Sequence, residues 1–380
     1  MVLLMKIPTL PLLLALCLPV PSLLSDPLPA WAASNPAGHP VRIAVHAPAD
    51  QSAAHLSWPK VIRTAKGTIV LAYSAGIGHN IGGSGLAVSL SKDGGQTFTP
   101  PRELIRFPDD DPRYRDCGNA ALGLADDGSI LLLAMGYNRD TANNIFGWRS
   151  VNDGATWMRS DTSALGPDKT GSIFGNVIPL KGRGLAVFGH YRAGSSPHTQ
   201  GLWISLSQDE GRSWGTAQRI AEVHGVEPAV VQSSGRLLGF FRGDSQSTRG
   251  RQYVGVSDDL GRSWKTELSI LDAQHPDKAR LAAPFAVENP GRPGELIVLT
   301  TERAVPGNTP GRIWLWRGSA KKLDWKRERV LLEFPRVDGG ANTDLGYPWL
   351  LHTGGNRWQM YYYHGNPRGA CHIWVTDVEL

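Results

Sequence analysis

Cysteine is scarce in this sequence, and long runs of basic residues are absent. Three cysteines occur among 380 residues, and no spacing of His and Cys suggests a structural zinc site. The formal net charge of +5 is modest for this length, and no Lys/Arg run resembles a nucleic-acid-binding arm. We therefore expect no nucleic-acid partner. The slight basicity fits an anionic glycan or simple solubility equally well.

Residues 1–32 have the composition of a secretory signal. Lys6 supplies a short basic start, Leu10 to Leu24 is apolar, and Ala30-Trp31-Ala32 resembles a cleavage site before Ala33. Prolines in the apolar stretch argue against stable insertion in a membrane. We therefore predict a secreted or periplasmic protein whose mature part is residues 33–380. A lipid anchor on Cys17 is the less favoured alternative, because Leu16 is large where a lipoprotein box needs a small residue.

The two cysteines of the predicted mature chain, Cys117 and Cys371, lie far apart in the sequence. They would belong to different repeats of the pattern described next. Two separate buried thiols are therefore expected in preference to a disulfide.

One eight-residue pattern occurs four times, as Ser-x-Asp/Asn-x-Gly-x-Thr/Ser-aromatic. The copies begin at positions 91, 150, 207 and 257, which are 59, 57 and 50 residues apart. Such a period is the signature of a propeller or a repeat array. The Ser and Asp/Asn side chains can bond to nearby backbone amides, and Gly takes the backbone angle that other residues resist. Each copy is therefore predicted to be a hairpin turn, whose final aromatic packs between neighbouring sheets.

The repeat resembles the Asp-box, or BNR repeat, of the sialidase superfamily. The resemblance covers most of the chain after the N-terminus. With 44 glycines and 27 prolines, the sequence fits many short strands joined by turns. The resemblance to the sialidase superfamily implies an all-β fold over residues 33–380. The expected architecture is a six-bladed β-propeller of four-stranded antiparallel sheets with Asp-box turns. The strand Val41–Val45 is expected to complete the last blade.

Propeller geometry divides the loops between two faces. The repeats join the third and fourth strands of a blade, so the starts of first strands and the ends of second strands lie on the opposite face, around the channel mouth where a pocket is expected. Polar residues predicted there include the following: His79-Asn80, Tyr137-Asn138-Arg139, His190-Tyr191-Arg192, Glu227, Arg242, Arg312, Tyr347 and His364. Loop ends are commonly polar, so the convergence of these residues carries the argument and no single member does.

Four of these residues resemble the catalytic set of family sialidases. Gly225–Val231 looks like the segment with the glutamate, here Glu227, and Asp344–Trp349 like the nucleophile segment, here Tyr347. The resemblance also implies that Arg242 and Arg312 hold a substrate carboxylate. A phenol with a pKa of about 10 is a poor nucleophile, so a nearby carboxylate must take its proton. Arginine holds a carboxylate through two parallel hydrogen bonds.

Two family features are missing. Ser57 stands where the first arginine is expected, and the loop from Gly76 to Gly83 has no carboxylate to act as acid/base. His79 could serve as the acid because histidine is the side chain that commonly exchanges protons near neutral pH. Asp116 is another candidate, although a turn residue is the slightly favoured interpretation, and Arg115 could replace the missing arginine.

The leading hypothesis is a glycoside hydrolase that cleaves terminal acidic sugars, with a carboxylate-bearing carbohydrate bound by Arg242, Arg312, Arg115, His190, Tyr191 and His364. One alternative is a polysaccharide lyase acting on uronic-acid-containing glycans, with His190 or Tyr191 as the base. Another is a glycan-binding propeller without catalysis. We expect no cofactor, no metal site and a monomeric protein.

Overall fold

The structure is a computed structural model. It describes residues 32–79, 83–107, 110–137, 144–165, 171–191, 201–221, 225–243, 251–268, 280–303, 311–335 and 344–380. The predicted signal therefore lies outside the described residues, and secretion stays a prediction. In the described part the chain forms β-strands and two short 3₁₀ helices, Gln51–Ala53 and Ser163–Leu165. No helix there is long and apolar enough to cross a membrane.

The strands are short and mostly buried, as expected for stacked antiparallel sheets. Their bounds in chain order are β1 Val41–Val45, β2 His55–Arg63, β3 Ile69–Gly76, β4 Gly85–Ser91, β5 Arg102–Arg106, β6 Asp116–Leu124, β7 Ile130–Tyr137, β8 Asn144–Ser150, β9 Met158–Ser160, β10 Ser172–Leu180, β11 Gly184–His190, β12 Leu202–Ser207, β13 Gln218–Ala221, β14 Gly225–Ser233, β15 Arg236–Gly243, β16 Gln252–Ser257, β17 Lys265–Leu268, β18 Arg280–Leu281, β19 Phe285–Glu288, β20 Glu295–Arg303, β21 Gly311–Ser319, β22 Lys326–Phe334, β23 Asp344–Gly354, β24 Arg357–Gly365 and β25 Cys371–Glu379.

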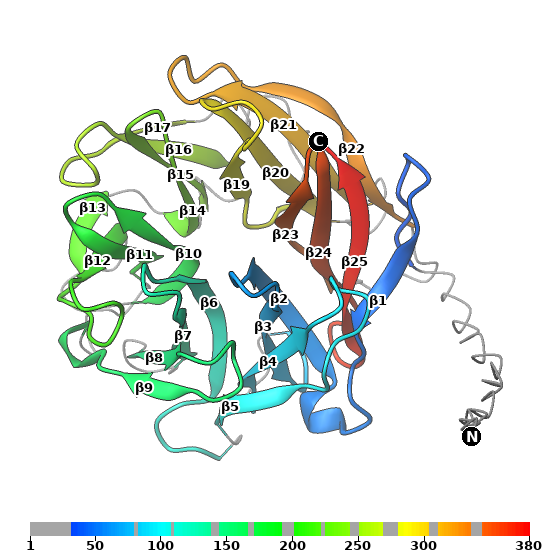
Figure 1. The fold of residues 1–380 in the computed structure, drawn as a ribbon. Helices are drawn as coiled ribbons and strands as arrows, with labels where there is room; N and C mark the ends of the chain where they lie inside the picture. Colours follow the sequence, from blue (N-terminus) through cyan, green and yellow to red (C-terminus); the bar gives the residue numbers. More distant parts are fainter. Residues whose placement is uncertain are drawn as a thin grey trace, which may run out of the picture. The chain divides into compact units, whose positions relative to one another are not determined.

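In successive groups, most strands pair antiparallel with the next strand along the chain, although β18 and β19 both pair with β20. Only short parallel contacts, His55 with Cys371 and two residue pairs between β6 and β10, join neighbouring groups into larger sheets. Between these contacts the described strands form antiparallel units that begin at β2, β6, β10, β14, β18/β19 and β23. The units are arranged around a common centre (Figure 1). β1 pairs with β25, so the start of the fold completes the unit at its end.

All four repeats fold into the same turn, which explains their shared residues. In the copy that begins at Ser207, the Ser207 hydroxyl accepts a 2.9 Å hydrogen bond from the Gly211 amide, and Asp209 accepts one of 2.9 Å from the Ser213 amide. The other three copies repeat both bonds at Gly95 and Thr97, Gly154 and Thr156, and Gly261 and Ser263. The predicted hairpin turns are therefore present.

The aromatic residue that ends each repeat packs toward a neighbouring unit. Phe98 meets Tyr361 of β24 with ring centroids 6.0 Å apart, and Trp264 meets Phe188 of β11 at 6.2 Å. Trp214 is 2% exposed. A fifth turn lacks the full pattern, yet its Trp325 contacts Phe240 of β15 at 5.1 Å. These contacts tie adjacent sheets together through apolar layers.

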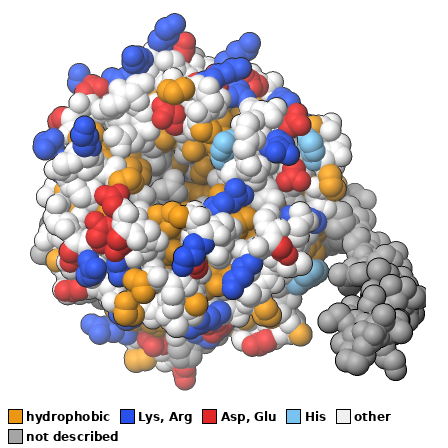
Figure 2. Space-filling view, in the orientation of Figure 1, with side chains coloured by type: hydrophobic (Ala, Val, Ile, Leu, Met, Phe, Trp, Pro, Cys, Tyr) orange, Lys and Arg blue, Asp and Glu red, His pale blue; other side chains and the backbone are white. Residues whose placement is uncertain are grey.

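The surface and the cysteines fit the expectations from composition. Acidic and basic side chains are interspersed on the face shown in Figure 2, which is hollowed near its centre. Cys117 and Cys371 are both buried free thiols. Burial raises the pKa of each thiol well above its usual range, which keeps both in the unreactive protonated form.

Candidate active site

The first strands of three units, β2, β14 and β23, each contain a bulge next to a residue of the site. Register shifts interrupt the pairing of β2, β14 and β23 at Trp58-Pro59, Glu227-Pro228 and Tyr347-Pro348. Proline has no N–H to donate, so the ladder cannot continue there. Trp58, Glu227 and Tyr347 take left-handed backbone angles, with φ of 55°, 61° and 51°. Such strain in non-glycine residues concentrates at functional sites.

Tyr347 and Glu227 form the pair predicted from the sequence, although they are 120 residues apart in the chain. The Tyr347 hydroxyl donates a hydrogen bond of 2.5 Å to Oε1 of Glu227, and both side chains are 4% exposed. Arg242, near the end of β15, donates from Nε to Oε2 of Glu227 at 2.7 Å. One carboxylate therefore contacts the phenol through one oxygen and a guanidinium through the other.

The electrostatics of this pair keep the carboxylate charged and the phenol protonated. Burial alone would raise the pKa of Glu227, but the charge and hydrogen bond of Arg242, together with the Tyr347 hydroxyl, hold that pKa at about 2. Burial and then the negative charge of Glu227 raise the pKa of Tyr347 well above its usual range. Glu227 is thus an ionised acceptor that faces the proton Tyr347 would have to lose.

His190 and Asn119 also contact Glu227, one at its backbone and one at its side chain. Nδ1 of His190 accepts a 3.1 Å hydrogen bond from the Glu227 amide, so its proton lies on Nε2. The Asn119 amide lies 3.4 Å from Oε1 of Glu227. His190 is only 1% exposed. His190 thus serves to fix the backbone of Glu227, whereas the sequence predicts a substrate contact.

Besides Arg242, a second arginine beside the pair is Arg303, at the end of β20. Arg303 lies with its guanidinium 5.9 Å from the ring centre of Tyr347, and it donates to the Leu345 carbonyl at 3.1 Å and to the Tyr363 hydroxyl at 2.7 Å. Arg312 instead donates to Glu333 at 3.0 Å and stacks on Trp314. Arg312 is thus paired with Glu333 of β22, whereas Arg303 lies beside Tyr347, and the role of Arg312 in holding a substrate carboxylate stays a prediction.

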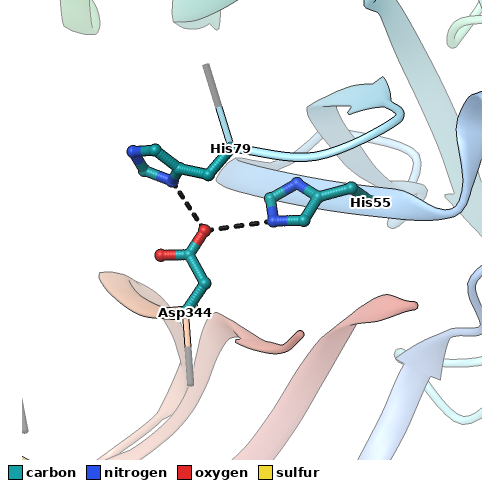
Figure 3. A group of neighbouring side chains, drawn as sticks. All are labelled: His55, His79 and Asp344. Atoms are coloured by element: carbon teal, nitrogen blue, oxygen red, sulfur yellow. Dashed lines mark hydrogen bonds and ion pairs between the residues drawn. The ribbon is translucent and has the colours of Figure 1, made fainter. Parts of the chain in front are cut away.

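Two histidines share one carboxylate beside this pair (Figure 3). Oδ2 of Asp344 lies 2.6 Å from Nδ1 of His79 and 3.0 Å from Nε2 of His55. The other oxygen accepts a 2.9 Å hydrogen bond from Tyr363. His79 is held by this bond through one ring nitrogen, and its other nitrogen points away from Asp344 (Figure 3). Trp58 bridges the two groups, with its ring 5.4 Å from His79 and 6.3 Å from Tyr347.

Lys60 lies fully buried among the aromatic rings of the site. Its Nζ is 4.3 Å from the ring centre of Phe174, 4.5 Å from that of Trp349 and 5.8 Å from that of Tyr347. Burial lowers the pKa of Lys60 to about 7, although the charge of Glu227 acts in the opposite direction. The amine can therefore change its charge near neutral pH.

The remaining predicted residues are Asp116, Arg115, Tyr191 and His364. Asp116 is 7% exposed and close enough to Cys117 to raise the pKa of that thiol. Arg115 contributes its backbone, which bonds to Tyr137 and Gly83. Tyr191 and His364 are 4% and 0% exposed. Their contacts with substrate stay predictions.

Tyr191 and His364 are buried against apolar and aromatic neighbours. Tyr191 packs in the apolar cluster that contains Trp203 and Trp214. His364 lies against Phe334, with ring centroids 4.9 Å apart, and burial lowers its pKa to about 3, so the ring stays neutral. Four residues named with this face, Asn80, Asn138, Arg139 and Arg192, lie outside the described residues.

Sequence reasoning missed Arg303, His55, Asp344 and Lys60 as members of the site. The rule that second strands end at this face would have found Arg303, had β20 been extended beyond Thr300. The matching rule for first strands would have found His55, the first residue of β2. Asp344 opens β23 three residues before Tyr347. Nothing in the local sequence marks Lys60.

Comparison with known structures places this arrangement among related folds. A protein of unknown function from Dyadobacter fermentans is 21% identical, with a TM-score of 0.65, over 90% of this chain and 99% of that one. The Hadza microbial sialidase Hz136 is 17% identical, with a TM-score of 0.67, over 90% and 68%. An α-L-arabinanase of Penicillium chrysogenum is 15% identical, with a TM-score of 0.61, over 92% and 98%.

At these identities the likeness establishes a fold of the propeller type and leaves the activity open. No curated protein matches the chain. The model of the BNR repeat-like domain matches residues 34–360, which include Tyr347, Glu227, Arg242, Arg303 and the His55, His79 and Asp344 cluster. The chain therefore belongs to the BNR repeat-like domain family.

Proposed function

We propose that this protein is a glycoside hydrolase in which Tyr347 is the nucleophile and Glu227 accepts its proton. The observation that carries the proposal is the 2.5 Å hydrogen bond from the Tyr347 hydroxyl to a buried, ionised carboxylate. Structural neighbours that are named as sialidases and arabinanases support the reaction class. We also propose that the antiparallel units form a six-bladed propeller, closed by the pairing of β1 with β25.

In the first step, the Tyr347 oxygen attacks the anomeric carbon while its proton passes to Oε1 of Glu227. The glycosidic bond breaks, and the leaving oxygen takes a proton from a general acid. Water then cleaves the glycosyl–tyrosine bond and gives a proton to the deprotonated general acid, while the proton on Glu227 returns to the Tyr347 oxygen. Arg242 stays on the other oxygen of Glu227 throughout and keeps the carboxylate oriented.

His79 is our proposed general acid, and Asp344 its positioning partner. The Nδ1–H of His79 donates to Asp344, which leaves Nε2 to carry the exchanged proton. His79 is the most exposed member of its cluster, with 22% of its side chain accessible. It comes from the loop where the sialidase resemblance predicts the acid/base.

The proposed substrate is a glycan with a terminal acidic sugar, because Arg242 and Arg303 both border the reacting pair. One observation favours a neutral arabinoside as the second candidate. Arg303 already faces Asp344 at 3.8 Å, and buried Ser57 supplies no charge, so little positive charge is left unbalanced. Against the lyase hypothesis, Nδ1 of His190, one of its two proposed bases, is engaged by the Glu227 amide.

The test is turnover by Tyr347→Phe. Loss of the hydroxyl removes the nucleophile and should lower kcat at least a hundredfold, with the fold retained. The purified protein is assayed with fluorogenic sialosides, uronosides and arabinofuranosides. Tyr362→Phe is the matched control, because the Tyr362 hydroxyl is buried and has no hydrogen-bond partner among the described residues. If Tyr347→Phe keeps more than a tenth of the wild-type kcat on the best substrate, the proposed nucleophile is wrong.

A further inference from the structure

The cluster of His55, His79 and Asp344 has the composition of a metal site as well as that of a catalytic dyad. Their nearest donor atoms, Nε2, Nδ1 and Oδ2, all lie within 4.8 Å of one another. A dyad needs one histidine and one carboxylate, so His55 has no part in the proposed proton transfer. It is 1% exposed, yet it directs Nε2 at the same oxygen as His79 does. The proposed mechanism therefore does not explain why a second histidine, His55, points at the Asp344 oxygen that His79 already contacts.

We propose that His55, His79 and Asp344 bind a divalent transition metal of the zinc type. Two imidazoles and one carboxylate form a known zinc ligand set, and imidazole nitrogen selects such metals over calcium and magnesium. Neutral imidazoles coordinate through a lone pair, so each ring would carry its proton on the nitrogen that faces away from the metal. The fourth position would be taken by water or by a ligand oxygen on the exposed side of His79.

The spacing of the donors requires a small adjustment. Metal bonds of about 2.0–2.2 Å in a tetrahedral site place ligand atoms roughly 3.4 Å apart. The present separations from Oδ2 of Asp344 are 2.6 Å to His79 and 3.0 Å to His55. Each nitrogen must therefore move away from Oδ2 by less than about 1 Å, and the two nitrogens already lie within 4.8 Å of each other. His79, at the edge of the cluster, has the exposure that allows this shift.

The surroundings of Asp344 support coordination through Oδ2. Its other oxygen, Oδ1, accepts the hydrogen bond from Tyr363 and faces Arg303 at 3.8 Å. These contacts fix the carboxylate plane and satisfy the oxygen that would not bind the metal. Partners of this kind orient the first ligands in established metal sites.

Metal binding would compete with catalysis, and this part rests on the proposed function. A metal on Nδ1 of His79 takes the place of the hydrogen bond to Asp344, and the N–H that then remains on Nε2 is too weak an acid to protonate a leaving oxygen. The bound metal should therefore inhibit hydrolysis, and a chelator should restore it.

The experiment measures metal binding directly, so it does not depend on a substrate. The full-length protein is treated with a chelator, dialysed and titrated with zinc sulfate by calorimetry at constant pH, and with Co²⁺ by visible absorbance. We expect one equivalent of Zn²⁺ to bind and Co²⁺ to show the strong visible bands of four-coordinate geometry. His55→Gln keeps a donor for Asp344 but removes a ligand, and should weaken binding at least tenfold.

Two further variants make the outcome decisive. His79→Gln should weaken binding similarly, and because it lies at the edge of the cluster it guards against misfolding of His55→Gln. His352→Gln, at a histidine whose ring bonds only locally to Gly355, should bind zinc like the wild type. Absence of binding, or binding that both cluster variants retain, would overturn the metal proposal. Zinc binding by a protein whose metal-free form hydrolyses none of the tested sugars would overturn the proposed function alone.

Discussion

At the scale of single residues, Lys60 is the most unusual group in the described core. A fully buried amine lies against Phe174 and Trp349, with no carboxylate of the described residues bonded to it. It donates only long hydrogen bonds, of 3.4–3.5 Å, to the backbone carbonyls of Trp58 and Pro59. The ordinary lysine pKa of 10.5 falls to about 7 in the fold. Between these two values the unfolded chain binds more protons than the folded chain, so this residue makes stability rise with pH over that window.

Lys60→Met should therefore stabilise the fold, and more so in acid. Below pH 7 the folded protein carries the full cost of the buried charge, so the substitution should raise the free energy of unfolding by about 3–5 kcal/mol at pH 6. At pH 9 the gain should be smaller by about 2–3 kcal/mol, because the folded amine is already neutral. Urea unfolding at both pH values measures the difference.

Lys66→Met is the control, since Lys66 pairs with Asp153 at 3.0 Å and its side chain is 74% exposed. It should change stability by less than about 1 kcal/mol at either pH. A gain at Lys60 that does not depend on pH would show that the amine is not charged in the fold near neutral pH.

Only some residues of the site could be predicted from the sequence. Tyr347, Glu227 and Arg242 were predicted because each lies in a local segment with a recognisable pattern. Arg303 was missed and Arg312 chosen because their separation depends on where β20 ends and which way each side chain turns. The meeting of His55 with Asp344, 289 residues apart, depends on the closure of the ring and leaves no trace in local sequence.

At the scale of elements, the repeat turns combine local hydrogen bonds with packing on a neighbouring unit. Gly211 has φ of +74°, and a Cβ added there would lie 2.5 Å from Leu131 of β7. Leu131 is fully buried, so it cannot move aside cheaply. By contrast, Gly235 in the β14–β15 turn has φ of +80° with nothing within 4 Å of an added Cβ.

Substitutions at these two glycines can therefore distinguish the energetic cost of backbone strain from that of overpacking. Gly235→Ala should cost about 1–2 kcal/mol, from the left-handed conformation alone. Gly211→Ala should cost a further 1–3 kcal/mol or so, from overpacking against Leu131. Denaturant midpoints of the two variants test this order. Equal losses of stability in the two variants would mean that the added methyl group at Gly211 does not overpack against Leu131 of β7.

The strands around these turns were largely predictable, whereas their bulges were not. Alternating patterns between glycine-containing turns located most second and third strands. The bulges at Trp58, Glu227 and Tyr347 arise because each is followed by proline in a strand that must otherwise pair. That x-Pro pattern is visible in the sequence, but its effect on side-chain direction follows only from the register of the neighbouring strand.

At the scale of the whole molecule, the repeat period predicted units around a centre, and it also predicted the strand that completes the last one. β1 pairs with β25 through Val41, Arg42, Ile43 and Val45. Asn35, just before it, donates to Thr376 and to the Asp377 carbonyl at 3.2 Å each. The period could not predict how far this closure stabilises the fold, because that depends on burial between the two ends of the chain.

Removal of β1 should therefore weaken the entire ring and not only its last unit. A chain that begins at residue 46 loses Val41, Ala44 and Val45, all 9% exposed or less, and exposes the edge of β25. At about 1–2 kcal/mol for each buried apolar side chain, the loss is roughly 3–6 kcal/mol, and Tm should fall by several degrees relative to a chain that begins at residue 33. A single cooperative transition at lower temperature would show that closure is shared by all units, whereas an unchanged Tm would show that β1 contributes nothing to it.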